Sequence, residues 1–412
     1  MSRSSTFLHA MTANNERVLI AGAGPVGLVA ANVLADAGIP VTVFEAEASL
    51  PQTLRASTFQ PSTLDLLARL DISKLLINMG LVAPRMQYRD RQGWVAEFNF
   101  GAIGDETAHP YRLQCEQFKL NGLLVERLAR IPHAEVRFDA RATHVRQDAD
   151  GVTLTLQGAD GATTTERGTW LIGADGGRSA VRDLLGVVLE GFTWTERFLV
   201  ASTPFDFADV IPGLAEVSYF ADPEQWFFLL RVPGLWRVML PVGADETDAD
   251  ILSDASIQRR LQCVHPNPAG YAIEHRTIYS VHQRVAPRYR VGRAFLAGDA
   301  AHLNNPLGGM GMNGGIHDAF NLADKLARVC LGQAGEALLD RYEAERRPVA
   351  LDYVNKITIA NKNNLETRDE ARQKTWREEM TRTAGDGQLA REYLLKVSMI
   401  SSLRRPEMHQ GA

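Results

Sequence analysis

The stretch Gly22-Ala23-Gly24-Pro25-Val26-Gly27 (GAGPVG) decides the fold of this chain. The apolar run Arg17–Ala21 before it predicts a buried strand, and Val26–Ala37 after it predicts a helix that Gly38 ends. Glycines at this spacing let the backbone turn tightly and approach a pyrophosphate on the helix N-terminus. The apolar run Val41–Phe44 completes a strand-helix-strand unit, which predicts a parallel sheet with helices on its faces.

An acidic residue, Glu45, follows the second expected strand about 20 residues after the glycines. An acid at this position accepts hydrogen bonds from an adenosine ribose and disfavours a 2′-phosphate. The alternative is a structural glycine turn beside a solvated glutamate. Strand, helix and acid together favour a site for FAD or NAD over one for NADP.

Two further motifs each follow an expected strand. Trp170 begins an apolar run that ends in Asp175-Gly176-Gly177 and restarts as a helix with its cap near Ser179; alone, this is an ordinary strand-turn-helix junction. The run 294–302 (AFLAGDAAH) leads into the glycine-dense segment 306–315 and an amphipathic helix expected over Ile316–Leu331. Glycine costs chain entropy unless close backbone approach requires it, so this segment indicates a ligand contact.

The order of expected elements gives an α/β fold with discontinuous domains. A Rossmann-like nucleotide-binding domain carries an inserted, mainly antiparallel β-sheet domain for the substrate, and a helical region ends the chain. We expect a disordered tail over 1–16. The nucleotide-binding domain takes 17–80, 101–187 and 285–337, the β-sheet domain takes 81–100 and 188–284, and the C-terminal helical region takes 338–412.

Composition narrows the class of partner. The 412 residues carry a net charge of −5, which argues against a nucleic-acid binder that relies on a basic surface. The uncharged run 18–35 contains turn-forming glycines and a proline, so no integral membrane segment is expected. Three widely spaced cysteines predict neither a disulfide framework nor a zinc site, and no metal is expected. These features favour small-molecule partners and a cytoplasmic location.

In this order the three motifs resemble the class A flavoprotein monooxygenases, the para-hydroxybenzoate hydroxylase-like aromatic hydroxylases. The resemblance runs from about Arg17 to Pro348. It implies FAD as cofactor, NADH or NADPH as electron donor, and O2. It also implies hydroxylation of a small phenolic or N-heterocyclic ring through a flavin C4a-hydroperoxide. Met310 and Ala46 stand where the family often has glutamine and a basic residue, but neither departure removes a backbone contact.

The resemblance also implies roles for single residues. Arg55 and Gln117 look like the family's flavin-contacting arginine and glutamine, with Arg112 and Gln114 as alternatives to Gln117, and both could instead be exposed polar residues. Pro306 would lie beside the flavin and fix its loop, which makes it the one candidate catalytic position. The remaining FAD contacts implied are Gly22, Gly24, Pro25, Val26, Gly27 and Glu45 at the ADP half, Asp175 and Gly176, Gly298 and Asp299 near the ribityl chain, and Gly309, Gly311, Met312 and Asn313 at the pyrimidine edge.

Candidates for the substrate pocket come from the expected β-sheet domain: Tyr219, Trp226, Phe228 and Arg237. Strand alternation puts Trp226 and Phe228 on one face, which could equally be ordinary core. Arg237 could pair with a substrate carboxylate or with a surface acid. A base that deprotonates the substrate is expected, but the sequence does not single one out, and His302 fits a structural role better.

Other activities on the same fold stay open. A flavin-dependent halogenase is disfavoured because its WxWxIP signature is absent, and a flavin-dependent reductase is a further alternative. A non-catalytic flavin-binding protein would predict damaged motifs, whereas Asp175, Asp299 and the glycine segment are intact. The aromatic substrate, the preferred nicotinamide donor, and a monomeric or homodimeric state are not determined by the sequence.

Overall fold

A six-stranded sheet forms the centre of the molecule. The computed structural model describes residues 17–404 except 53 and 55, so the expected tail over 1–16 and the role expected for Arg55 lie outside the described residues. The predicted parallel sheet is confirmed: β1 pairs in parallel with β2 and β12, and only the edge strand β18 is antiparallel. The order is β18 (Arg290–Val291), β19 (Ala294–Leu296), β12 (Trp170–Gly173), β1 (Val18–Ala21), β2 (Val41–Phe44) and β8 (Ala134–Arg137).

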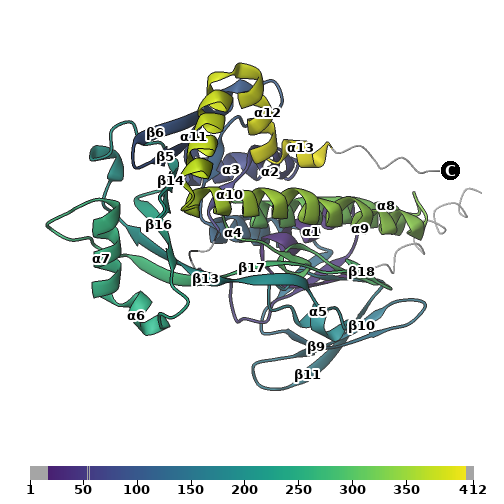
Figure 1. Cartoon of the computed structure of the whole chain (residues 1–412). Coiled ribbons are helices and arrows are strands. Elements are labelled where there is room, and N and C mark those ends of the chain that lie inside the picture. The colour runs from purple at the N-terminus through teal and green to yellow at the C-terminus, as the bar shows by residue number, and fades with distance from the viewer. Residues whose placement is uncertain (1–16, 53, 55, 405–412) are drawn as a thin grey trace, which may run out of the picture.

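The strands β1, β2 and β12 are fully buried, and α1 (Pro25–Asp36) packs on β1 and β2. Helix α1 contacts both α4 (Gln117–Leu128) and α8 (Gly311–Cys330). An antiparallel meander at the bottom of Figure 1 and the short helix α5 (Ala180–Leu184) follow β8 along the chain. The meander strands are β9 (Arg141–Gln147), β10 (Val152–Gln157) and β11 (Thr163–Gly168).

Helix α8 begins earlier than expected. Its first turns are the segment 311–315, which the sequence analysis assigned to a loop before a helix at Ile316. Gly315 explains the difference, because an added Cβ would lie 2.7 Å from Val26 Cγ2 and 3.0 Å from Gly298 Cα. Its missing side chain lets the start of α8 pack directly against α1, so the glycines serve helix packing as well as a loop.

The second large sheet has eight strands and is antiparallel except for the parallel pair β14–β5. Segments from both expected parts of the β-sheet domain meet in it, as the predicted fold class requires. The division into domains stays an interpretation, because β4 (Leu81–Ala83) lies in a separate small sheet, where it and β3 (Thr58–Phe59) both pair with the central strand β7 (Arg112–Gln114). The large sheet runs β20 (His302–Leu303), β17 (His275–Val285), β13 (Glu190–Thr203), β16 (Leu235–Val242), β15 (Phe227–Val232), β14 (Val217–Ala221), β5 (Arg85–Asp90) and β6 (Gly93–Asn99).

Each face of this sheet packs against its own set of helices. One face buries a cluster with α6 (Asp248–Leu252) and α7 (Asp254–Val264), seen at the left of Figure 1. The other face buries an aromatic cluster with α10 (Lys356–Glu366), α11 (Glu370–Gly385) and α12 (Gly387–Val397). The C-terminal region is therefore helical as predicted, and it is also packed on the β-sheet domain.

The remaining helices connect these layers. The C-terminal run passes from α9 (Asp340–Pro348) through a π-helical segment, η5 (Val349–Asn355), into α10. No helix among residues 17–404 that the structure describes is long and apolar enough to cross a membrane. The other bounds are α2 (Pro61–Ala68), α3 (Ser73–Met79), η1 (Phe100–Ile103), η2 (Phe207–Asp209), η3 (Gly298–Ala300), η4 (Glu336–Leu339) and α13 (Ile400–Leu403).

Candidate active site

The glycine turn between β1 and α1 leaves one open position at the helix N-terminus. A Cβ on Gly22 would lie 2.4 Å from the Ala174 carbonyl oxygen, and one on Gly27 would lie 2.1 Å from the Gly22 oxygen. Gly24 differs, because its Cβ would meet nothing within 4 Å. Gly24 is also the N-cap of α1, and no side chain in the described part of the protein caps that helix. The uncapped N–H groups and the open space suit a phosphate group.

The other two motifs converge on this turn. Ala174, directly before Asp175, contacts the Gly22 position, and a Cβ on Gly298 would lie 2.7 Å from Val26 Cγ2. Gly298 has φ +61°, which places the exposed Asp299 in a tight turn beside the start of α1. The structure thus brings together three motifs that are far apart in the sequence.

Glu45 and Asp175 both hold local structure in addition to their predicted cofactor roles. Glu45 accepts a hydrogen bond from Ala23 N at 2.8 Å and so braces the glycine turn. Asp175 accepts from Ser179 Oγ at 2.5 Å and from Val181 N at 3.0 Å, and Ser179 caps α5 as predicted. Burial raises the pKa of Asp175, although these hydrogen bonds oppose the shift. Their contacts with FAD stay predictions.

The loop after Pro306 is fixed by two side chains. Gly308 and Gly309 have φ values of +98° and +63°. Asn313 donates to the Gly309 oxygen at 2.6 Å and to the Thr58 oxygen at 2.8 Å. Gln60 donates through Nε2 to the Gly308 oxygen at 2.8 Å. No side chain among residues 17–404, apart from the undescribed 53 and 55, caps α8, so the N–H groups at its start remain available to a ligand.

These observations test whether FAD fits the chain. The open position at Gly24, two uncapped helix N-termini and the Asp299 turn meet the needs of a dinucleotide with a pyrophosphate and a redox ring. Gln114 adds a buried amide, because its Nε2 has no hydrogen-bond partner among the described residues. Gln117, the first residue of α4, is half-buried, and Met312 is half-buried in the first turn of α8. The residues present therefore fit FAD.

A buried cluster of charged and polar side chains contacts the Gly298 turn next to the start of α8. Asp318 of α8 pairs with Arg346 Nε at 2.6 Å and with His302 Nε2 at 2.7 Å, and it accepts from Gly298 N at 3.2 Å. His302 therefore has the structural role that was expected. Sequence reasoning missed Asp318 and Arg346, although their position after the glycine segment was the available signal.

We expect His317 to make the protein sensitive to acid. Its side chain is buried beside Thr63, and burial, with the charge of Arg346, lowers its pKa from 6.5 to about 3. In the unfolded chain His317 is protonated as the pH falls through 6.5, whereas in the folded protein it is protonated only near pH 3. The free energy of unfolding therefore falls as the pH falls through this range. His317 lowers the free energy of unfolding by at most about 1.4 kcal/mol for each pH unit.

Urea unfolding between pH 7 and pH 4 measures this effect. His317→Gln removes the titrating group, so its free energy of unfolding should depend less on pH than that of the wild type. His144→Gln changes an exposed histidine and serves as the matched control. Equal slopes in His317→Gln and the wild type would contradict the expectation.

A cavity with aromatic side chains in its wall lies between the C-terminal helices and the eight-stranded sheet, next to the glycine loop. It has a volume of about 440 Å³, and α10, α11 and α12 supply most of its wall, together with η5 and one residue of β5. Its lining includes Tyr88, Ile357, Asn361, Trp376, Met380 and Tyr393. Asn361 joins the cavity to the loop, because a Cβ on Gly308 would lie 3.5 Å from Asn361 Nδ2.

The substrate residues expected from the sequence lie close to this cavity. Trp226 and Phe228 share a face, as predicted, and are buried with Tyr219 in the aromatic cluster that contains Tyr88 and Trp376. None of the three lines the cavity itself. The contribution of α11 and α12 was not predicted from the sequence, where its signal is the large residues Trp376, Met380 and Tyr393 in largely charged helices.

Arg237 points toward the nucleotide-binding domain. It donates to Ser57 Oγ at 2.8 Å and to the Leu54 oxygen at 3.1 Å. It is only 6% exposed, so it is buried rather than on the surface. Burial lowers the pKa of Arg237, and Tyr279 opposes the shift. Whether it contacts substrate stays a prediction.

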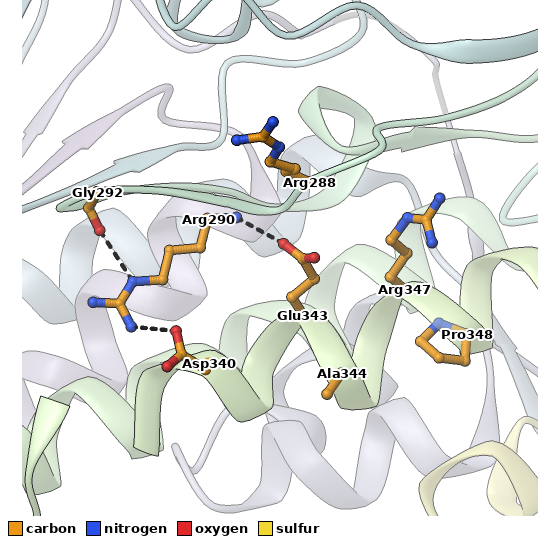
Figure 2. Close-up of a pocket in the computed structure, with 8 residues that line it drawn as sticks. All are labelled: Arg288, Arg290, Gly292, Asp340, Glu343, Ala344, Arg347 and Pro348. Carbon is orange, nitrogen blue, oxygen red and sulfur yellow. Dashed lines mark hydrogen bonds and ion pairs between the residues drawn. The ribbon is translucent and has the colours of Figure 1, made fainter. Parts of the chain in front are cut away.

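A second cavity, of about 550 Å³, lies between α9 and the chain before β19 (Figure 2). Its wall contains arginines and acids, several of which already pair: Arg290 with Asp340 at 2.7 Å, and Glu343 with Tyr289 N at 2.7 Å. Among the residues that the structure describes, its lining includes no aromatic side chain and no predicted cofactor residue. The aromatic cavity is therefore the better reaction site.

The fold and the two halves of the site define a dinucleotide-binding oxidoreductase with an aromatic pocket. Comparison with known proteins makes the class specific. Residues 15–356 match the family model described as "FAD binding domain". Para-nitrophenol 4-monooxygenase of Pseudomonas sp. (strain WBC-3) is 34% identical over 398 residues, which cover 94% of this chain and 96% of that protein. The chain belongs to this FAD-binding family of flavoprotein aromatic monooxygenases.

Two other similarities agree with this assignment. The 6-hydroxy-3-succinoylpyridine 3-monooxygenase of Pseudomonas putida (strain DSM 28022 / S16) is 33% identical and covers 85% of this chain and 89% of its own. The crystal structure of p-nitrophenol 4-monooxygenase from Pseudomonas putida DLL-E4 superposes with a TM-score of 0.88 at 31% identity, over 94% of this chain and 99% of that chain.

Proposed function

We propose that this chain is an FAD-dependent monooxygenase that uses NADH or NADPH and O2 to hydroxylate a single-ring phenol or hydroxylated N-heterocycle. The observation that carries the proposal is the aromatic cavity, which meets the glycine loop at Asn361 and Gly308. Relatives named for para-nitrophenol and for a hydroxypyridine support a single hydroxylated ring as substrate. A cytoplasmic location and a monomeric or homodimeric state complete the proposal.

The chain's own residues would bind and orient rather than perform the redox step. FAD, when bound, supplies the electron transfer and oxygen activation. Gly24 and the N-terminus of α1 would hold the pyrophosphate, and Asp299 the ribityl chain. The N–H groups at the start of α8 would stabilise negative charge on the pyrimidine edge, and Pro306 would fix the loop beside it. The buried aromatic cluster behind the cavity excludes water from the ring.

Two measurements test the proposed function. The absorption spectrum of the purified protein should show bound flavin. NADH and NADPH oxidation should then rise when phenols or hydroxypyridines are added, with one oxygen atom from O2 in the product. Flavin without stimulation by any aromatic compound would favour the non-catalytic alternative, and a colourless protein that cannot be loaded with FAD would overturn the proposal.

A further inference from the structure

Gln283 is a buried glutamine of β17 whose side-chain amide makes four hydrogen bonds. The residue is 2% exposed. Its Oε1 accepts from Asn305 N at 3.0 Å and from Asn305 Nδ2 at 3.3 Å. Its Nε2 donates to Asn355 Oδ1 at 3.0 Å and to Thr358 Oγ1 at 2.9 Å. A primary amide has two donor hydrogens and two acceptor lone pairs, so every hydrogen-bonding position of this side chain is used.

On one side, this amide holds the chain around Pro306. The N–H of Asn305 can only donate, so the oxygen of Gln283 must face it and the NH2 group must face away. Asn305 is itself fully buried, and its Oδ1 accepts from Leu307 N at 3.1 Å. Proline has no N–H group, so the residues on either side of it supply the hydrogen bonds that hold it. Gln283 and Asn305 therefore fix the backbone both before and after Pro306.

On the other side, the amide is anchored on the C-terminal helices. Asn355 is the last residue of η5, and Thr358 lies in the first turn of α10. A π-helical turn is rare and is found frequently at functional sites. Tyr353 and Ile357 of the same stretch line the aromatic cavity. The stretch thus forms part of the cavity wall and also accepts both hydrogen bonds from Gln283.

We propose that Gln283 is a positioning residue, which holds the Pro306 loop against the pyrimidine edge of FAD by tying it to the helical wall of the aromatic cavity. The inference rests on the proposed function and names the residue that orients this loop. Gln60 and Asn313 hold the two glycines that follow in the loop. The N–H groups at the start of α8 stabilise negative charge on the reduced ring, so a loop released from Gln283 would bind reduced FAD less well.

The midpoint potential of the bound flavin, measured in the FAD-loaded protein against a reference dye, tests this role. Gln283→Met keeps the length of the side chain and removes all four hydrogen bonds. Its affinity for reduced FAD relative to oxidised FAD should fall about tenfold, which lowers the potential of the two-electron couple by about 30 mV. Gln283→Glu keeps an oxygen for Asn305 and should lie closer to the wild type.

Gln258→Met is the matched control. Gln258 of α7 also fixes a backbone segment with its amide, because it donates to the Tyr271 oxygen at 2.6 Å and accepts from Tyr271 N at 2.9 Å. It packs on the face of the eight-stranded sheet that is opposite the aromatic cluster. Its loss should leave the flavin potential unchanged.

The outcomes separate a positioning role from a purely structural one. A structural role would destabilise Gln283→Met in urea and leave its flavin potential equal to that of the wild type, which would overturn the inference even if the protein hydroxylates phenols. If Gln283→Met retains no flavin, Thr358→Val removes a single acceptor and should lower the relative affinity for reduced FAD severalfold; an unchanged potential there would also overturn the inference. A wild type that binds no flavin would overturn the proposed function and this inference with it.

Discussion

Replacing Gly24 by valine should abolish flavin binding without unfolding the protein. A Cβ at Gly24 meets no protein atom within 4 Å, and the residue has φ −75° and ψ 177°, which any amino acid adopts. The added side chain would instead occupy the space where the pyrophosphate must approach the backbone. We expect an FAD affinity lower by on the order of 100-fold or more. Flavin content after purification and titration of the apoprotein with FAD measure the loss.

Gly335 provides a matched control for this change. It is also an N-cap glycine, with φ −77° and ψ 162°, and a Cβ there meets nothing within 4 Å. Gly335→Val should retain flavin, and both variants should unfold within about 1 kcal/mol of the wild type, the usual range for an N-cap substitution. A Gly24→Val protein that is yellow and fully loaded would contradict the proposed pyrophosphate site.

Replacing Arg346 by methionine should strongly destabilise the fold. Arg346 is 4% exposed and pairs with Asp318, which is fully buried. Removing one member of a buried pair leaves an uncompensated charge, which costs about 3–5 kcal/mol. Arg69→Met is the matched control, because Arg69 and Asp324 pair with side chains 47% and 44% exposed, where such a pair contributes about 1 kcal/mol or less. Chemical denaturation near neutral pH measures both changes.

The difference in the free energy of unfolding between the wild type and Arg346→Met should depend on pH if it arises from the charge of Asp318. Burial would raise the pKa of Asp318, but the charges of Arg346 and His302 outweigh it and lower the pKa from 3.8 to about 2. A carboxylate with a lowered pKa stabilises the fold above its unfolded pKa and loses that contribution as the pH falls. The gap between wild type and Arg346→Met should therefore narrow between about pH 4 and pH 2. A loss below 1 kcal/mol near neutral pH would mean that the cluster relaxes or takes up water.

Local signals predicted the nucleotide-binding half of the molecule well. The strand, glycine turn and helix around GAGPVG lie within one or two residues of their expected positions, because hydrophobic runs and obligatory glycines are properties of short segments. The Ser179 cap was predictable for the same reason. The start of α8 at Gly311 was not predictable in this way. The glycine at position 315 serves the close packing of α8 against Val26 and Gly298, which are distant in the sequence.

The substrate half depended on contacts between distant segments. Alternation correctly placed Trp226 and Phe228 on one face, but it could not say that Tyr88 and Trp376 would complete the same cluster. Arg237 lies against the nucleotide-binding domain at Ser57 because β16 carries it there, a placement that no local pattern contains.

By itself, the sequence determined the parallel nucleotide-binding sheet, the order of its three motifs and the family they resemble. Each of these depends on residues that are close in the chain, or on glycines at positions whose backbone conformation other residues rarely adopt. The tertiary structure alone decided which residues form the cavity, which charges are buried, and that the Tyr88 and Tyr393 hydroxyls form a hydrogen bond. Burial and pairing depend on which segments pack together, and Tyr88 and Tyr393 meet only because the C-terminal helices pack on the eight-stranded sheet.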